Sequence, residues 1–216
     1  MSKRTKALIR WCQWILILPI VAGLLGCEGE SDDHDFGDND PNIYIAMGDS
    51  ITSGYGLDSP SEAYPTLLSG MLGKPVYNDG VDGTFSSYGA SQVTSVLNTY
   101  KPGYLLILSG VNDLIHSYSV DSIVDNLRFI IQTAKNNKTI PVIATLTPVF
   151  DSHSFIEGNI IELNTRIRKL AAEENIHVAD LENTFKWDPA YLNSDGLHPN
   201  SQGHELIAWT FYYILE

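Results

Sequence analysis

The sequence predicts a three-layer α/β/α sandwich built around a five-stranded parallel sheet. Two observations predict this class: five short apolar runs have the character of strands, and segments with the spacing of amphipathic helices alternate with them. Strands that are apolar throughout are typical of a parallel sheet that helices cover on both faces. The chain has 216 residues, of which 44% are hydrophobic, and this is enough for one domain with a substantial core.

The strands and helices follow one another along the chain from residue 42 to the C-terminus. The predicted strands are residues 42–47, 75–77, 104–108, 140–146 and 176–179. The predicted helices are residues 63–72, 87–100, 120–135, 155–174 and 201–215. Right-handed crossovers between parallel strands favour a doubly wound sheet, in which functional sites lie at the carboxyl ends of the strands.

The N-terminus has the pattern of a secretory signal. The first ten residues carry four basic side chains and no acid, and an uncharged, apolar stretch follows from residue 11 to residue 26. The stretch ends in Leu24-Leu25-Gly26-Cys27, which resembles the lipobox of bacterial lipoproteins. That resemblance implies cleavage before Cys27, acylation of this cysteine with chains such as palmitate, and a place in the cell envelope. The alternative is an uncleaved signal-anchor helix. Glu28 after the cysteine favours the outer membrane in a cell with two membranes, by the same resemblance.

Residues 27–41 are predicted to form an acidic tether between the anchor and the folded domain. The segment from residue 28 to residue 41 holds seven acids, no Lys or Arg, and Phe36 as its one large apolar side chain. A calcium loop is the alternative, but the twelfth position counted from Asp33 is Tyr44 rather than Glu. The predicted organisation is therefore a signal peptide at 1–26, a lipidated cysteine and tether at 27–41, and one catalytic domain at 42–216.

Charge and cysteine usage exclude several classes of protein. The formal net charge is −13, which argues against a nucleic-acid-binding face. The two cysteines, Cys12 and Cys27, lie ahead of the predicted domain and form neither a disulfide framework nor a zinc motif. No Walker loop or GxGxxG motif is present, so no nucleotide cofactor is expected.

Three polar motifs stand at positions that this fold would bring to one edge. They are Gly48-Asp49-Ser50 after the first strand, Gly110-Val111-Asn112-Asp113 after the third, and Asp195-Gly196-Leu197-His198-Pro199 before the last helix. Each alone could be a cap or a turn. Together they supply a hydroxyl, an amide and an Asp/His pair.

These motifs, in this order, resemble those of the SGNH hydrolases, also called the GDSL esterases and lipases. The resemblance covers residues 42–216 and implies the flavodoxin-like fold of that family. It also implies that Ser50 is the nucleophile, that His198 is the general base and that Asp195 orients His198. The oxyanion hole would comprise the Ser50 amide, the Gly83 amide and the Asn112 side chain, with no metal or organic cofactor. Gly80 is the other glycine available for the hole; we favour Gly83 and expect Gly80 to permit a turn.

Elementary chemistry agrees with these roles. A serine hydroxyl needs a base, imidazole titrates near neutral pH, and a carboxylate on its second nitrogen fixes the tautomer. Asp49 and Asp113 are expected to hold loops by hydrogen bonds. The remaining histidines are expected to be at the surface or structural. Phe150 and Phe155 could line an acyl pocket or simply pack.

The sequence therefore predicts a lipid-anchored serine esterase that hydrolyses carboxylic esters through an acyl-enzyme. The resemblance is nearest to the arylesterase, thioesterase and lysophospholipase branch. The alternatives are a carbohydrate O-deacetylase, an acyltransferase, and a surface-binding lipoprotein that has lost catalysis. The expected partners are an ester substrate and the membrane through Cys27. Neither nucleic acid nor an obligate protein partner is implied.

Overall fold

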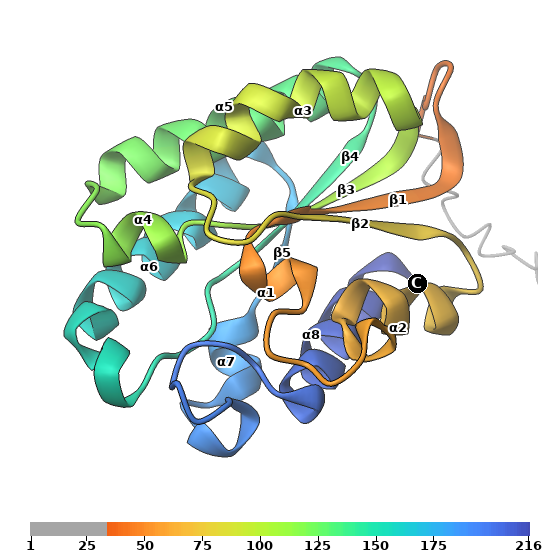
Figure 1. Ribbon diagram of the computed structural model, residues 1–216. Helices are drawn as coiled ribbons and strands as arrows, with labels where there is room; N and C mark the ends of the chain where they lie inside the picture. Colours follow the sequence, from red (N-terminus) through yellow and green to blue (C-terminus); the bar gives the residue numbers. More distant parts are fainter. Residues whose placement is uncertain (1–33) are drawn as a thin grey trace, which may run out of the picture. The chain divides into compact units, whose positions relative to one another are not determined.

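A computed structural model describes residues 34–216 and shows a five-stranded sheet between two layers of helices (Figure 1). All the strand pairs are parallel, and the strand order is β2-β1-β3-β4-β5. The strands are β1 (Asp40–Gly48), β2 (Val76–Gly80), β3 (Pro102–Leu108), β4 (Ile140–Ala144) and β5 (His177–Ala179). The predicted three-layer α/β sandwich and its parallel sheet are confirmed.

The long helices lie where the alternating pattern predicts them. They are α2 (Tyr64–Leu72), α3 (Ser86–Tyr100), α5 (Val120–Asn136), α6 (Glu157–Glu174) and α8 (Ser201–Leu215). One layer contains α3, α5 and α6, and the other contains α2 and α8 (Figure 1). Three short helices join them, namely α1 (Ser50–Ser53), α4 (Val111–Ile115) and α7 (Leu181–Phe185). The 3₁₀ turns are η1 (Pro60–Glu62), η2 (Asp151–Ile156) and η3 (Pro189–Tyr191).

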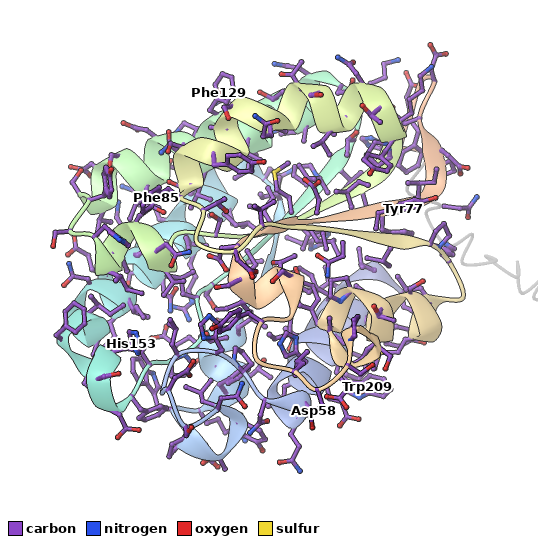
Figure 2. The ribbon with its side chains drawn as sticks, in the orientation of Figure 1. Asp58, Tyr77, Phe85, Phe129, His153 and Trp209 are labelled. Atoms are coloured by element: carbon purple, nitrogen blue, oxygen red, sulfur yellow. The ribbon has the colours of Figure 1, made fainter. Side chains whose placement is uncertain are left out.

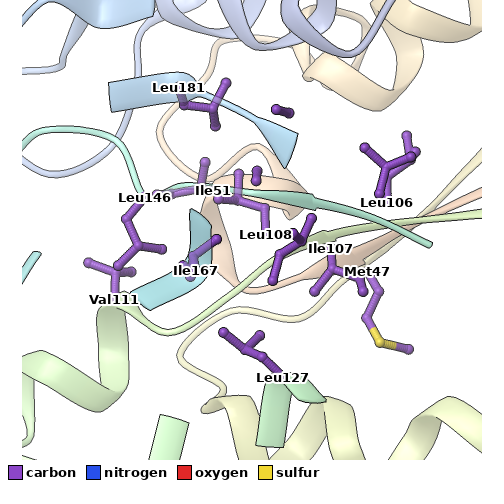
Figure 3. Close-up of a cluster of buried hydrophobic side chains, with 14 of the residues drawn as sticks. Met47, Ile51, Leu106, Ile107, Leu108, Val111, Leu127, Leu146, Ile167 and Leu181 are labelled. Atoms are coloured by element: carbon purple, nitrogen blue, oxygen red, sulfur yellow. The ribbon is translucent and has the colours of Figure 1, made fainter. Parts of the chain in front are cut away.

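The core lies between the sheet and both helix layers. Figure 3 shows side chains of the central strands packed against residues of α5 and α6, among them Leu127 and Ile167. In α5 the apolar residues recur at helical spacing and are buried, while Ser119 Oγ caps the helix by accepting from Ser122 N at 3.2 Å. Burial of this continuous apolar surface is the main stabilising contribution.

The register of the sheet brings three loops to the same edge. Gly48, the last residue of β1, pairs with Gly80 of β2 on one side and with Leu108 of β3 on the other. The three strands therefore end level with one another, and the segments that follow them start side by side. These segments carry the first two polar motifs, so the fold itself assembles them.

The folded body begins earlier than the predicted boundary at residue 42. β1 starts at Asp40, whose amide donates to Lys101 O at 2.8 Å. Asn39 Nδ2 donates to Asn137 O at 2.6 Å, and the ring of Phe36 lies 5.8 Å from that of Tyr104. Specific polar contacts and one aromatic contact thus attach the end of the acidic segment, from about residue 35, to the domain.

The predicted signal peptide, Cys27 and the tether up to residue 33 lie outside the described residues. Within residues 34–216, the helices are all too short or too polar to cross a bilayer.

Candidate active site

Ser50 is the first residue of α1, two positions after the end of β1. Asp49 caps this short helix, since its Oδ1 accepts a hydrogen bond from Ile51 N at 3.0 Å. Ser50 Oγ lies 2.9 Å from Nε2 of His198, although 148 positions separate the two residues in the sequence. The predicted nucleophile and base are thus brought into hydrogen-bond contact.

Asp195 holds the other side of the His198 ring. Its Oδ2 lies 2.6 Å from His198 Nδ1, and its Oδ1 accepts from the amides of Leu197 and His198 at 2.9 and 3.0 Å. A carboxylate only accepts, so Nδ1 carries the hydrogen and Nε2 presents a lone pair to Ser50. Partial burial would raise the pKa of Asp195, but the hydrogen bonds from His198 and the two amides outweigh it and lower the pKa.

The loop with Asp195 and His198 is held in place from both sides. Asn193 N donates to His198 O at 2.8 Å, and Leu192 and Pro199 form an antiparallel bridge. The segment after β4 supports the loop from outside: Phe150 N donates to Gly196 O at 2.8 Å, and His153 Nδ1 donates to Asp195 O at 2.9 Å. Gly196 has a φ of 70° and lies against Phe150 O, so a side chain there would collide with backbone.

The side of the site formed by α4 contains Asn112. Its Nδ2 donates to Thr84 O at 3.0 Å, which uses one of its two amide hydrogens and leaves the second available. Thr84 follows Gly83, whose φ of 71° belongs to the left-handed region, and Val81 N of the same loop donates to Gly48 O at 3.1 Å. The loop 81–84, which contains Gly83, is therefore bonded both to the end of β1 and to α4.

Gly80 has a different role from the turn that was expected. It is the last residue of β2, and a Cβ atom there would collide with the backbone nitrogen of Ser53 in α1. Glycine is required because the strand and the helix that carries Ser50 pack backbone against backbone.

Asp49 and Asp113 hold loops, as expected, but they differ in environment. Asp113 accepts from Ser86 N at 2.8 Å and from Ser86 Oγ at 2.7 Å, and so joins α4 to the start of α3. Asp49 is buried, and its Oδ2 has no hydrogen-bond partner within the described part of the chain. Burial, reinforced by the charges of Asp113 and Asp82, raises the pKa of Asp49 to about 7 even though the Ile51 amide opposes the shift.

Three further residues at this edge escaped the sequence analysis as contributors to the site. Tyr55 packs its ring on His198, with the ring centroids 4.7 Å apart. His153, labelled in Figure 2, contacts the backbone of Asp195, and His116 Nδ1 donates to Asn112 O at 2.9 Å. Their common signal is position: each follows the carboxyl end of a strand. His204, in contrast, is structural, because it is buried, accepts from Tyr64 N at 3.1 Å and has a pKa that burial lowers to about 4.

The structure separates the two phenylalanines that were candidates for an acyl pocket. Phe150 packs, with its ring 6.3 Å from that of Trp187. Phe155 is 66% exposed and borders a surface cavity of about 470 Å³ together with Leu114, Tyr118 and Ile156. In the described region, no group of His, Cys, Asp and Glu has an arrangement that could hold a metal ion.

Comparison with known proteins gives consistent matches. A family model described as "GDSL-like Lipase/Acylhydrolase family" matches residues 46–206. Thioesterase 1/protease 1/lysophospholipase L1 of Escherichia coli K12 is 25% identical over 169 residues, which is 76% of this chain and 78% of the relative. A putative lipolytic protein of the G-D-S-L family from Desulfitobacterium hafniense has a TM-score of 0.72 at 22% identity, covering 80% of this chain and 99% of its own. A lipase/acylhydrolase from Enterococcus faecalis has a TM-score of 0.70 at 26% identity, covering 80% and 94%.

Proposed function

Because the chain belongs to the GDSL-like lipase/acylhydrolase family and is a serine ester hydrolase, we propose that it cleaves acyl esters through an acyl-enzyme on Ser50. The observation that carries this proposal is the continuous hydrogen-bonded chain from Ser50 Oγ to His198 Nε2, at 2.9 Å, and from His198 Nδ1 to Asp195 Oδ2, at 2.6 Å. Ser50 is the nucleophile, His198 is the general base, and Asp195 orients the imidazole and stabilises the imidazolium.

The reaction takes place in two steps. In acylation, a bond forms between Ser50 Oγ and the carbonyl carbon, while the serine proton moves to His198 Nε2. The bond from that carbon to the alcohol oxygen then breaks, and His198 gives its proton to the departing oxygen. In deacylation a water molecule forms the new bond to carbon and transfers a proton to His198 Nε2. The Ser50 Oγ–carbon bond breaks, and that proton returns to Oγ.

The negative charge on the carbonyl oxygen needs donors that are already in place. We assign this role to the amides of Ser50 and Gly83 and to the second Nδ2 hydrogen of Asn112. The support is that Thr84 O fixes the Asn112 amide at 3.0 Å, so the side chain does not have to reorganise when charge develops. Loss of one such donor typically costs about 3 kcal/mol in the barrier.

The acyl group of the substrate is proposed to pass α4 toward the cavity that Leu114, Tyr118, Phe155 and Ile156 border. An acyl chain of moderate length would cover the exposed rings of Tyr118 and Phe155. The name of the E. coli relative suggests thioesters and lysophospholipids as substrates. The second candidate function is the removal of acetyl groups from carbohydrates. An acetyl group is short, so this reaction would not need the cavity.

We also propose that the mature protein is anchored by acyl chains on Cys27, after removal of residues 1–26. The support is the apolar stretch that ends in Leu24-Leu25-Gly26-Cys27. Expression in cells fed labelled palmitate tests it: the wild-type chain should carry the label in the membrane fraction, and Cys27→Ala should not. Equal labelling of both chains would contradict the anchor.

A p-nitrophenyl ester series from acetate to long chains tests the activity, with a soluble form that begins at Glu28. We expect Ser50→Ala to lower kcat by about four orders of magnitude or more. Ser91→Ala is the matched control, because its hydroxyl bonds only within α3, donating to Tyr88 O. The chain-length optimum distinguishes a lipid or thioester hydrolase from a deacetylase. Unchanged activity in Ser50→Ala would contradict the proposed mechanism.

A further inference from the structure

Tyr55 occupies a position that the proposed mechanism does not use. Its ring centroid lies 4.7 Å from that of His198, the two planes are inclined by 47°, and 55% of the residue is exposed. An exposed tyrosine alone means little on a protein surface. An exposed ring packed on the imidazole that gives a proton to the leaving alcohol is a more specific arrangement.

Backbone contacts of the loop fix the position of Tyr55. Tyr55 N donates to Ser50 O at 3.0 Å, so the residue is tied to the nucleophile. The neighbouring Gly54 and Gly56 have φ values of 91° and 86°, which glycine adopts without strain. A Cβ atom at Gly56 would lie 2.9 Å from the side-chain Nδ2 of Asn193. The backbone N–H of the same residue donates to His198 O. The loop therefore fits closely between the Ser50 turn and the His198 loop.

The chemistry of acylation determines which part of a substrate meets this ring. The alcohol oxygen leaves with the proton from His198 Nε2, so it must come within hydrogen-bond reach of that nitrogen. The carbonyl oxygen points to the donors near Gly83 and Asn112. The alcohol part of the ester is therefore placed beside the imidazole, where Tyr55 is exposed.

We infer that Tyr55 forms the binding wall for the alcohol part of the substrate and selects esters whose alcohol carries a ring with an apolar face, either aromatic or sugar. Aromatic rings and the apolar faces of sugar rings both stack on a tyrosine, whereas a short alkyl chain covers little of it. The inference rests on the proposed function, since it assumes that Ser50 and His198 carry out acyl transfer.

A set of acetates that differ only in the alcohol tests the inference in the full-length chain. We expect Tyr55→Ala to lower kcat/KM for phenyl acetate and for an acetylated pyranoside by about 3- to 10-fold. Ethyl acetate should be affected far less. Tyr55→Phe keeps the aromatic ring and should behave as wild type. Tyr55→Leu keeps much of the bulk without an aromatic ring and should behave as Tyr55→Ala does. Tyr213→Ala is the matched control, because Tyr213 is exposed on α8 and stacks on Trp209 instead.

The deacylation step separates a substrate contact from an effect on His198. Every acetate gives the same acetyl-Ser50, from which the alcohol has already departed. The single-turnover rate of deacylation should therefore be unchanged in Tyr55→Ala. If deacylation slows, or if kcat/KM falls equally for ring and chain acetates, Tyr55 acts on His198 and the inference is overturned.

The outcomes also distinguish this inference from the proposed function. Full activity in Ser50→Ala would contradict the proposed function, and the inference about Tyr55 would fail with it. An inactive Ser50→Ala combined with a uniform effect of Tyr55→Ala would overturn the inference alone. A loss confined to phenyl acetate identifies aryl alcohols as the preferred class, and a loss confined to the pyranoside identifies sugars.

Discussion

Asp49 is a buried carboxyl next to Ser50, the proposed nucleophile, and burial keeps it neutral at acidic pH. Its pKa is raised to about 7 in the folded protein, from an ordinary value near 3.8. Between about pH 4 and pH 7 the unfolded chain releases this proton while the folded protein retains it. The folded state therefore becomes progressively less stable as pH rises through this window, and the penalty is constant above it.

Asp49→Asn should remove this pH-dependent penalty. Asn retains an oxygen that can accept from Ile51 N, so the cap is preserved. Relative to wild type, the free energy of unfolding of Asp49→Asn should rise from pH 4 to pH 7, by on the order of a few kcal/mol in total. Urea titrations at several pH values measure this. A difference between the two chains that does not change with pH would show that Asp49 is already ionised in the folded protein.

His153 is predicted to position the loop that carries Asp195 and His198, the proposed catalytic pair, without touching the substrate. Its Nδ1 donates to Asp195 O at 2.9 Å, and this bond supports the loop from η2. His153→Ala should lower kcat by up to about 10-fold with little change in KM, because a hydrogen bond of this kind contributes about 1 kcal/mol. His153→Asn can place an amide donor in the same position and should restore most of the activity. His177→Ala, on the exposed start of β5, is the control; an equal effect of the two alanine variants would contradict the role of His153.

At the scale of whole elements, helix α1 depends on the absence of a side chain in the neighbouring strand. A Cβ atom at Gly80 would collide with the backbone of Ser53. Gly80→Ala should therefore lower the free energy of unfolding by about 1–3 kcal/mol and reduce kcat, because α1 carries Ser50. Gly70→Ala is the control: it lies within α2 with open space around it and should stabilise the protein by about 0.5–1 kcal/mol. If Gly80→Ala has the same free energy of unfolding as wild type, α1 can move away from β2 without loss of stability, which would contradict this prediction.

The length of an element decides whether the sequence could predict it. The long helices and the strands were predictable because apolar side chains recur in them at a helical or continuous spacing, as in α5 from Val120 to Asn136. Helices α1, α4 and α7 have four or five residues each, too few for any periodicity to show. The order of the motifs identified Ser50, Asn112 and His198 as candidate site residues. The contacts of Tyr55 with His198 and of His153 with Asp195 depend on how distant loops meet, which no local sequence pattern encodes.

For the molecule as a whole, the acidic segment ahead of β1 determines where the stable domain begins. Asp40 N donates to Lys101 O at 2.8 Å, Asn39 Nδ2 donates to Asn137 O at 2.6 Å, and Phe36 contacts the ring of Tyr104. These contacts attach residues 36–40 to the amino-terminal end of the sheet, whereas Ser50 follows the carboxyl end of β1. They should therefore affect stability and leave the chemistry unchanged.

A chain that begins at Asn42 should consequently be less stable than one that begins at Glu28, by about 2–4 kcal/mol, because it lacks several hydrogen bonds and an aromatic contact. A chain that begins at Asp35 should match the longer one, since it retains all of these contacts. Urea unfolding of the three chains measures the difference, and kcat at 25 °C should be the same in each. Equal stability of the chains from Asn42 and Glu28 would return the boundary to residue 42. A loss of stability already at Asp35 would extend the domain into the segment before it.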